Sequence, residues 1–124
     1  MRRFGVSIPD NLAEDLDRLV KILGVSRSEI VREALKAYLK DFSHYLTKHE
    51  CCGIIATVSS GVLKVVEEYK DVVNSYTHAH LGDSCVNSFL VSGSSDRIAE
   101  LHRRLMGVCE HVRFIPLKCN VFKP

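Results

Sequence analysis

Residues 3–30 read RFGVSIPDNLAEDLDRLVKILGVSRSEI, a short strand pattern followed by the signals of two helices. Apolar and polar side chains alternate over residues 3–8, which is the period of a half-buried strand. Pro9 ends the strand, and leucines then recur at helical spacing until Gly24, a residue typical of helix C-caps. We therefore expect a strand over residues 3–8 and a helix over residues 10–23.

A second helix is predicted to begin at Ser26, because a serine followed three residues later by Glu29 is the capping-box pattern. The apolar positions of this helix form a stripe that is too wide for one neighbour to bury. These positions are Ile30, Val31, Ala34, Leu35, Tyr38, Leu39 and Phe42.

A single copy of this half of the chain cannot cover its own apolar surface. A lone strand has two unpaired edges, and modules below about 40 residues seldom fold alone. Two copies would pair their strands into an antiparallel ribbon and leave Arg3, Gly5 and Ser7 of each copy on the exposed face. Because such a ribbon fits the major groove of double-stranded DNA, we expect residues 1–45 to be a ribbon-helix-helix DNA-binding domain that works as a homodimer.

Strand and helix patterns alternate along the rest of the chain. The polar residues 43–50 indicate the end of the second helix or a connector. Strands are expected over 53–58, 72–81, 85–92 and 112–117, helices over 62–69 and 94–106, and turns over 59–61 and 82–84. The order β-α-β-β-α-β is the ferredoxin-like arrangement. The predicted fold class is therefore α+β, with a second domain over residues 51–124.

Composition narrows the function classes. The 124 residues carry 17 basic and 15 acidic side chains, so any contact with DNA must be local rather than a matter of bulk charge. The longest nearly uncharged run, residues 51–63, is shorter than the roughly 20 apolar residues that span a bilayer. The chain has five cysteines, an odd number, and no export signal, which favours reduced thiols over disulfides. We therefore expect a cytoplasmic protein that has no membrane partner.

Residues 77–85, THAHLGDSC, are the segment richest in chemistry. In a strand His78 and His80 point to the same face, and the tight turn after them can bring Cys85 close. Two imidazole nitrogens and one thiolate suit zinc, copper or nickel. Two solvated histidines and a small core cysteine would give the same pattern without a metal, so that interpretation stays open. No strained nucleophile turn surrounds Cys85, which disfavours a nucleophilic site. We expect no enzyme, because no acid-base pair stands at a workable spacing.

A ribbon-helix-helix start, a ferredoxin-like domain and a His-x-His…Cys segment in one short chain resemble the nickel-responsive transcriptional regulators, the NikR family. The resemblance covers nearly all of the chain. The segments that carry it are residues 3–9, Leu16-Asp17, residues 26–35, residues 78–81 with Cys85, and Gly107-Val108. It implies a repressor of transcription that binds operator DNA and forms a homotetramer through an ACT-like C-terminal domain.

The resemblance also implies a metal site with one altered position. In the family, nickel is held by the His-x-His pair and the cysteine of one subunit and by an upstream histidine of a partner. His78, His80 and Cys85 match the first three positions, whereas Glu67 stands where the upstream histidine is expected. A carboxylate is a harder ligand than imidazole, so zinc or cobalt would be admitted as well as nickel. The loop from His80 to Cys85 is one residue shorter than in the family.

Two further sets of residues are candidates for binding. Glu29 and Glu33 match an acidic pair that in the family helps to form a second cation site; the alternative is a helix cap and a solvated face. Gly5 offers no side chain to DNA, so base contacts would fall to Arg3 and Ser7. Arg3 would hydrogen-bond to guanine or bind a phosphate, and Ser7 is compatible with several bases. Ser26 and Arg27, at the start of the second helix, are suited to a phosphate. Instead of a metal, the second domain could sense an amino acid or serve tetramerisation alone.

Overall fold

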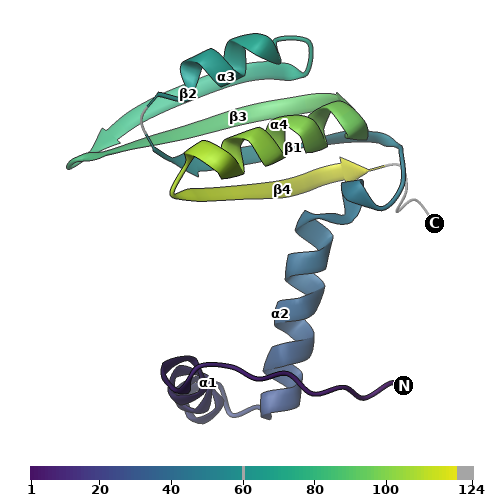
Figure 1. Ribbon diagram of the computed structural model, residues 1–124, viewed down its shortest axis with the longest axis vertical. Helices are drawn as coiled ribbons and strands as arrows, with labels where there is room; N and C mark the ends of the chain where they lie inside the picture. Colours follow the sequence, from purple (N-terminus) through teal and green to yellow (C-terminus); the bar gives the residue numbers. More distant parts are fainter. Residues whose placement is uncertain (60, 120–124) are drawn as a thin grey trace. The chain divides into compact units, whose positions relative to one another are not determined.

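The computed structural model describes residues 1–59 and 61–119, in two compact units, Met1–Tyr38 and Leu39–Pro124 (Figure 1). The middle of the turn expected over residues 59–61 and the end of the predicted second domain, residues 120–124, lie outside the described residues. No helix in the described ranges is both long and apolar enough to cross a membrane.

The first unit contains two helices at the positions that the sequence predicts. Helix α1 spans Asp10–Leu23 and ends at Gly24, whose φ of 67° lies in the left-handed region and whose N–H donates to the Val20 carbonyl. Helix α2 spans Arg27–Asp41, and the Ser26 hydroxyl caps it by accepting a hydrogen bond of 3.1 Å from the Glu29 backbone N–H. The end of α1 could be predicted because glycine, which has no Cβ, readily adopts the left-handed conformation. The start of α2 could be predicted because serine is a preferred N-cap residue.

The strand expected over residues 3–8 is not formed in the single chain, where residues 1–9 have no regular secondary structure. A strand needs a neighbour to accept its ladder hydrogen bonds, and one copy provides none. The alternating apolar side chains are exposed: Phe4 by 77%, Val6 by 72% and Ile8 by 39%. None of residues 1–42 is buried. The first unit therefore has no core of its own.

The second unit is a four-stranded antiparallel sheet with two helices on one face (Figure 1). Its elements are η1 (Ser43–Tyr45), β1 (Glu50–Val58), α3 (Leu63–Glu68), β2 (Val73–Leu81), β3 (Ser84–Ser94), α4 (Ser95–Val108) and β4 (His111–Cys119). The strand order β2-β3-β1-β4 is that of a ferredoxin-like domain, as the order of elements predicted. The unit begins at Leu39, earlier than the expected start at Cys51, because η1 packs with α4 and Asp41, the last residue of α2, pairs with Arg113 of β4.

The core lies between the sheet and helices α3 and α4. Alternate residues of β1 and β3 point into it, including Ile55 and Phe89, and meet apolar residues of the helices. The core members are Cys51, Ile55, Val62, Val65, Val66, Tyr69, Val72, Phe89, Val91, Ile98, Leu101, Leu105 and Phe114. Gly53 is part of this packing, since a Cβ there would lie 2.6 Å from the Ile115 carbonyl oxygen. Among the described residues of the second unit, none forms a helix on the opposite face of the sheet.

Two histidines with no expected role lie inside the second unit. His44 of η1 and His102 of α4 are buried among aromatic rings, with Phe42 stacked on His102 and Phe114 edge-on to His44. Burial lowers the pKa of His44 to about 4, helped by the nearby His102 and His49, and also lowers the pKa of His102. The polar segment 43–50, expected as a helix end or a connector, therefore contributes a buried side chain.

Candidate functional site

The hairpin of β2 and β3 sets the positions of the candidate metal ligands. Its turn consists of Gly82 and Asp83, and the φ of 61° at Gly82 is that of the glycine-first hairpin turn. Counting outward from this turn, His80 pairs with Cys85 across the ladder. The short loop thus places Cys85 directly opposite a histidine rather than away from it.

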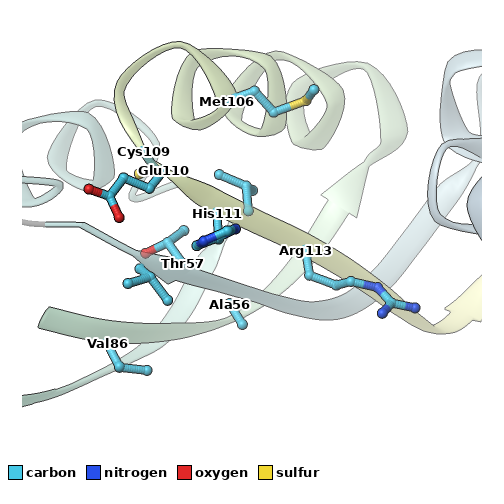
Figure 2. A pocket seen from close by; sticks show the side chains of 10 residues that line it. Ala56, Thr57, Val86, Met106, Cys109, Glu110, His111 and Arg113 are labelled. Atoms are coloured by element: carbon cyan, nitrogen blue, oxygen red, sulfur yellow. The ribbon is translucent and has the colours of Figure 1, made fainter. Parts of the chain in front are cut away.

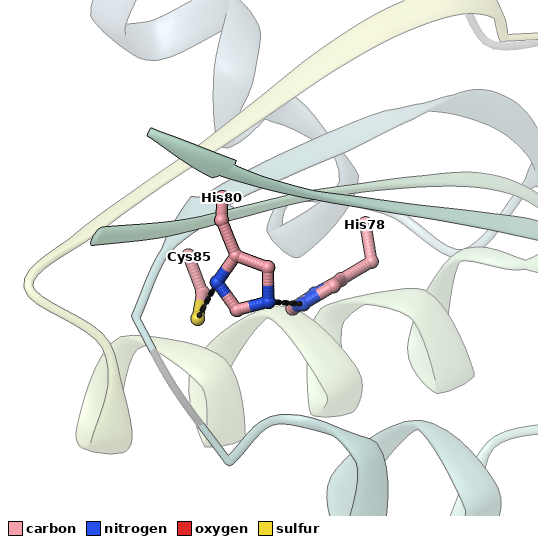
Figure 3. A group of neighbouring side chains, drawn as sticks. All are labelled: His78, His80 and Cys85. Atoms are coloured by element: carbon pink, nitrogen blue, oxygen red, sulfur yellow. Dashed lines mark hydrogen bonds between the residues drawn. The ribbon is translucent and has the colours of Figure 1, made fainter. Parts of the chain in front are cut away.

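His78, His80 and Cys85 form one cluster on the helix-bearing side of the hairpin (Figure 3). Nε2 of His78 lies 3.2 Å from Nε2 of His80, and Sγ of Cys85 lies 3.5 Å from Nδ1 of His80. The donor atoms of all three side chains lie within 4.8 Å of one another. The histidines are exposed and the cysteine is half-buried, so an ion could reach the cluster from solvent.

The cluster fits a transition-metal ion in both chemistry and spacing. Imidazole and thiolate ligands bind such ions at about 2.0–2.3 Å, so two ligands of one ion stand roughly 3 Å apart when adjacent and up to about 4.6 Å when opposite. The separations in the cluster are of this size. Two nitrogens and one sulfur suit nickel, zinc, copper and cobalt better than magnesium or calcium.

A buried amide stands directly behind His78. Oδ1 of Asn87 lies 2.7 Å from Nδ1 of His78 and accepts a hydrogen bond of 3.0 Å from the Tyr76 hydroxyl. The Asn87 amide nitrogen donates to Thr57 Oγ1 and to the Ser59 carbonyl. The sequence interpretation missed Asn87 and Tyr76. Asn87 could have been found from the two-residue turn, because counting residues outward from that turn along both strands pairs Asn87 with His78.

The other candidate ligands are not part of this cluster. Glu67 lies exposed on α3, and the metal-binding group found among the described residues does not include it. Glu29 and Glu33 are one helical turn apart on α2. The Glu29 backbone is capped by Ser26, and the Glu33 carboxylate pairs with Lys36 at 3.3 Å.

The candidate DNA-contacting residues are all exposed in the first unit. Arg3, Gly5 and Ser7 lie in the irregular segment 1–9. Ser26 and Arg27 lie at the start of α2, as expected, but the Arg27 guanidinium already pairs with Asp17 of α1 at 2.6 Å. A phosphate at this helix start would have to compete with the Asp17 carboxylate for Arg27.

A pocket of about 510 Å³ opens at one end of the sheet, beside the end of α4 (Figure 2). It is lined by Ala56, Thr57, Val58, Val86, Met106, Cys109, Glu110, His111, Val112 and Arg113. Arg113, the side chain best suited to hold the carboxylate of an amino acid, donates from Nε to Asp41 at 2.8 Å. Burial raises the pKa of the Cys109 thiol, partly offset by hydrogen bonds from Ser59 and Thr57. The pocket therefore gives no specific support to an amino-acid site.

Both halves of the chain match known families. The family described as "Ribbon-helix-helix protein, copG family" matches residues 2–41, and the family described as "NikR C terminal nickel binding domain" matches residues 56–119.

Relatives named "Putative nickel-responsive regulator" extend over nearly the same length. The one from Thermococcus onnurineus is 31% identical over 116 residues, which cover 86% of this chain and 84% of the relative. The one from Methanopyrus kandleri is 32% identical over 116 residues, covering 86% and 82%. The one from Dictyoglomus turgidum is 31% identical over 113 residues, covering 83% and 84%.

These matches join a DNA-binding half to a metal-binding half in the order that the sequence predicted, and they belong to regulators of transcription rather than to enzymes. The chain belongs to the family of metal-responsive ribbon-helix-helix transcriptional regulators that carry the NikR C-terminal domain.

Proposed function

We propose that this regulator responds to nickel, which it binds through His78, His80 and Cys85. The observation that carries the proposal is the gathering of these three donors within 4.8 Å in the domain that matches the nickel-binding family. Bound metal would supply a rigid cross-link between β2 and the start of β3. Zinc, cobalt and copper accept the same donors and are therefore competing ions in the test.

The fourth ligand is proposed to come from outside the chain's own cluster. Three donors leave one position of a four-coordinate site unfilled. Glu67 is exposed, and the resemblance implies that it replaces the family's fourth ligand, so we assign that role to Glu67 of a second copy. Its removal should weaken nickel binding less than removal of Cys85 does, because a water molecule can replace a carboxylate.

The homodimer is supported by the missing core of the first unit. None of residues 1–42 is buried, and helix α2 alone exposes Val31, Leu35, Tyr38 and Leu39. Two copies that pair their residues 3–8 as a ribbon and pack their helices together would bury this surface. At about 25 cal/mol per Å² of apolar area, the association would supply the stability that one copy lacks.

The homotetramer is supported by the helix-free face of the sheet. Leu90 is 47% exposed and Ile115 is 43% exposed on this face, beside the half-buried Ile54, Ala56 and Val86. A contiguous apolar face of this kind marks an association surface. The proposed occupant is the same face of a second copy, which would join two dimers through their second units.

The paired ribbons are proposed to bind operator DNA in the major groove and repress transcription in the cytoplasm. Arg3 would bind guanine or a phosphate, Ser7 would contact bases, and Gly5 would let the backbone approach closely. The N–H groups around Ser26, with Arg27, would hold a phosphate of the DNA backbone.

A second cation is proposed to bind at Glu29 and Glu33. Both carboxylates lie on one face of α2, and their local partners, a serine and a lysine, are exposed and replaceable. Titration with potassium or magnesium, carried out separately on the Glu33→Gln variant and on the unmodified protein, tests this site. Equal responses of the two proteins would contradict it.

The experiment that tests the function uses the full chain freed of metal. Duplexes with a randomised centre are selected for binding with Ni²⁺ present, and the selected duplex is then titrated with Ni²⁺, Zn²⁺, Co²⁺, Cu²⁺ or no metal. Nickel should tighten DNA binding by more than tenfold. If no metal changes the DNA affinity by more than a few fold, the proposal of a metal sensor is wrong. An increase in thermal stability on adding an amino acid would then favour the amino-acid alternative.

Cysteine variants make the test specific to the site. Cys85→Ser should lose the nickel response, because an alcohol does not replace a thiolate ligand. Cys52→Ser is the matched control, since Cys52 is also a half-buried free cysteine but lies on β1, outside the cluster. Loss of the response in both variants would point to a general effect on folding and not to a metal ligand.

A further inference from the structure

We propose that Asn87 is the positioning residue of the metal centre: it fixes the proton of His78 on Nδ1 and so presents Nε2 to the metal. The role in metal binding rests on the proposed function. The position of the proton does not, because it follows from hydrogen bonds of the metal-free protein.

The orientation of the Asn87 amide is determined by its surroundings. The side chain is only 1% exposed, and its nitrogen lies 3.2 Å from the Ser59 carbonyl oxygen and 3.3 Å from Thr57 Oγ1. A backbone carbonyl can only accept a hydrogen bond, so the amide NH₂ must face Ser59. The reverse orientation would bring two acceptor oxygens together. Oδ1 must therefore face His78.

This orientation determines the tautomer of His78. Oδ1 of Asn87 lies 2.7 Å from Nδ1 of His78, a distance at which two bare acceptors would repel each other. Oδ1 carries no proton, so the hydrogen must be on Nδ1. In a neutral imidazole the lone pair is then on Nε2. The Tyr76 hydroxyl, 3.0 Å from Oδ1, donates to the same oxygen and helps to hold it in place.

The direction of hydrogen bonding then propagates through the cluster. A bare Nε2 on His78 accepts from His80, whose Nε2 lies 3.2 Å away and must carry the proton. Nδ1 of His80 is consequently an acceptor and faces the Cys85 thiol at 3.5 Å. One buried amide thus aligns three ligand side chains in a single donor direction, from Cys85 to His80 to His78.

The consequence for metal binding is preorganisation. A partner that holds the non-ligating nitrogen of a histidine fixes both its tautomer and its ring orientation, and loss of such a partner typically weakens metal binding about 10–100-fold. Asn87 is suited to this role because the core holds it on one side, through Thr57 and Ser59, while its oxygen reaches the exposed His78 on the other.

The first test needs no metal. Long-range ¹H–¹⁵N correlation spectra of the metal-free protein, at a pH where the histidines are neutral, report which nitrogen of each imidazole carries the proton. We expect His78 to be protonated on Nδ1, and Asn87→Leu to give a mixture of both tautomers. A His78 protonated on Nε2 in the unmodified protein would overturn the inference, whether or not Asn87→Leu folds.

The second test measures Ni²⁺ affinity by competition with a chelator of known strength. Asn87→Leu should bind nickel about 10–100-fold more weakly. Asn87→Asp should bind it more nearly as the unmodified protein does, because a carboxylate still accepts from Nδ1. Asn74→Leu is the matched control, since Asn74 lies on the same hairpin but its Oδ1 accepts from the Ser92 hydroxyl.

The outcomes separate the two proposals. Equal nickel affinity of Asn87→Leu and the unmodified protein, with both folded by circular dichroism, would overturn the positioning role while leaving the nickel site intact. Failure of the unmodified protein to bind nickel, with His78 still protonated on Nδ1, would overturn the proposed function and not the assignment of the proton.

Discussion

The imidazole rings of His44 and His102 lie with their centroids 5.6 Å apart in the second unit, and none of their ring nitrogens has a hydrogen-bond partner among the described residues. Both side chains are almost fully buried. Burying a polar group without a partner costs free energy, and burying it charged costs more. The two rings are therefore tolerated only in their neutral form.

We predict that the second unit loses stability as the pH falls from 7 to about 4. The unfolded chain binds protons at the usual histidine pKa of about 6.5, whereas folded His44 does so only near pH 4, so protons favour the unfolded state over this range. The shift at His44 corresponds to about 3 kcal/mol, fully present above pH 7 and lost by pH 4. Urea unfolding at fixed protein concentration and several pH values measures it.

The control for this prediction exchanges the histidines. His44→Phe should flatten the pH dependence, because an apolar ring in that aromatic cluster does not titrate. His111→Gln, which removes an exposed histidine at the start of β4, should leave the slope unchanged. Identical slopes in all three proteins would show that other groups cause the loss of stability.

Gly53→Ala is predicted to destabilise the second unit by about 1–3 kcal/mol, the usual cost of overpacking a core. The added Cβ would lie 2.6 Å from the Ile115 carbonyl oxygen and 2.8 Å from the Phe114 ring, so β1 and β4 would have to separate. Gly107→Ala is the matched control, since a Cβ at this helical position meets nothing within 4 Å. Thermal unfolding of both variants should show a lower midpoint only for Gly53→Ala.

Arg3→Ala is predicted to weaken binding to the selected duplex by about 1–3 kcal/mol while leaving dimerisation intact. If Arg3 contacts guanine, the variant should lose affinity for the selected duplex alone. If Arg3 contacts a phosphate, the variant should lose affinity equally for random DNA, and its binding should depend less on salt concentration. Fluorescence anisotropy with both duplexes at two salt concentrations separates these cases. Unchanged affinity in a dimeric Arg3→Ala protein would count against the ribbon as the DNA-binding element.

Leu90→Lys is predicted to split the tetramer into dimers without unfolding the second unit. The side chain lies on the helix-free face of the sheet, where a buried ammonium group would have no partner. Val108→Lys places the same charge at the end of α4, at a residue that is 58% exposed, and should leave the assembly unchanged. Sedimentation velocity distinguishes tetramer from dimer. A tetrameric Leu90→Lys protein would place the tetramer contact elsewhere.

Local signals predicted most of the fold. Gly24 ends α1 and Ser26 caps α2 through interactions within a few residues, so these boundaries could be inferred directly. The order of strands and helices in the second unit followed from periodicity. The strand ends were less accurate, as β1 begins at Glu50 and not at Gly53, because pairing with β3 extends it.

Interactions between distant segments account for what was missed. The burial of His44 depends on Phe114 and His102, more than fifty residues away along the chain, and nothing near His44 in the sequence indicates it. The cluster of His78, His80 and Cys85 was predicted from the spacing of these residues, whereas Asn87 becomes visible only once the hairpin register is counted from its turn. Glu67 remains a prediction, because the atoms that would test it belong to a second copy.

No residue among residues 1–42 is buried in the single chain, so the proposed homodimer makes folding of the DNA-binding half a bimolecular event. Its population must rise with protein concentration, as for any fold that exists only in the associated state. Any association of second units that holds two first units within reach replaces bulk concentration with an effective concentration in the millimolar range for a short connection. Changes in how the second units assemble would then alter the fraction of DNA-binding halves that are folded, even where every contact with DNA stays the same.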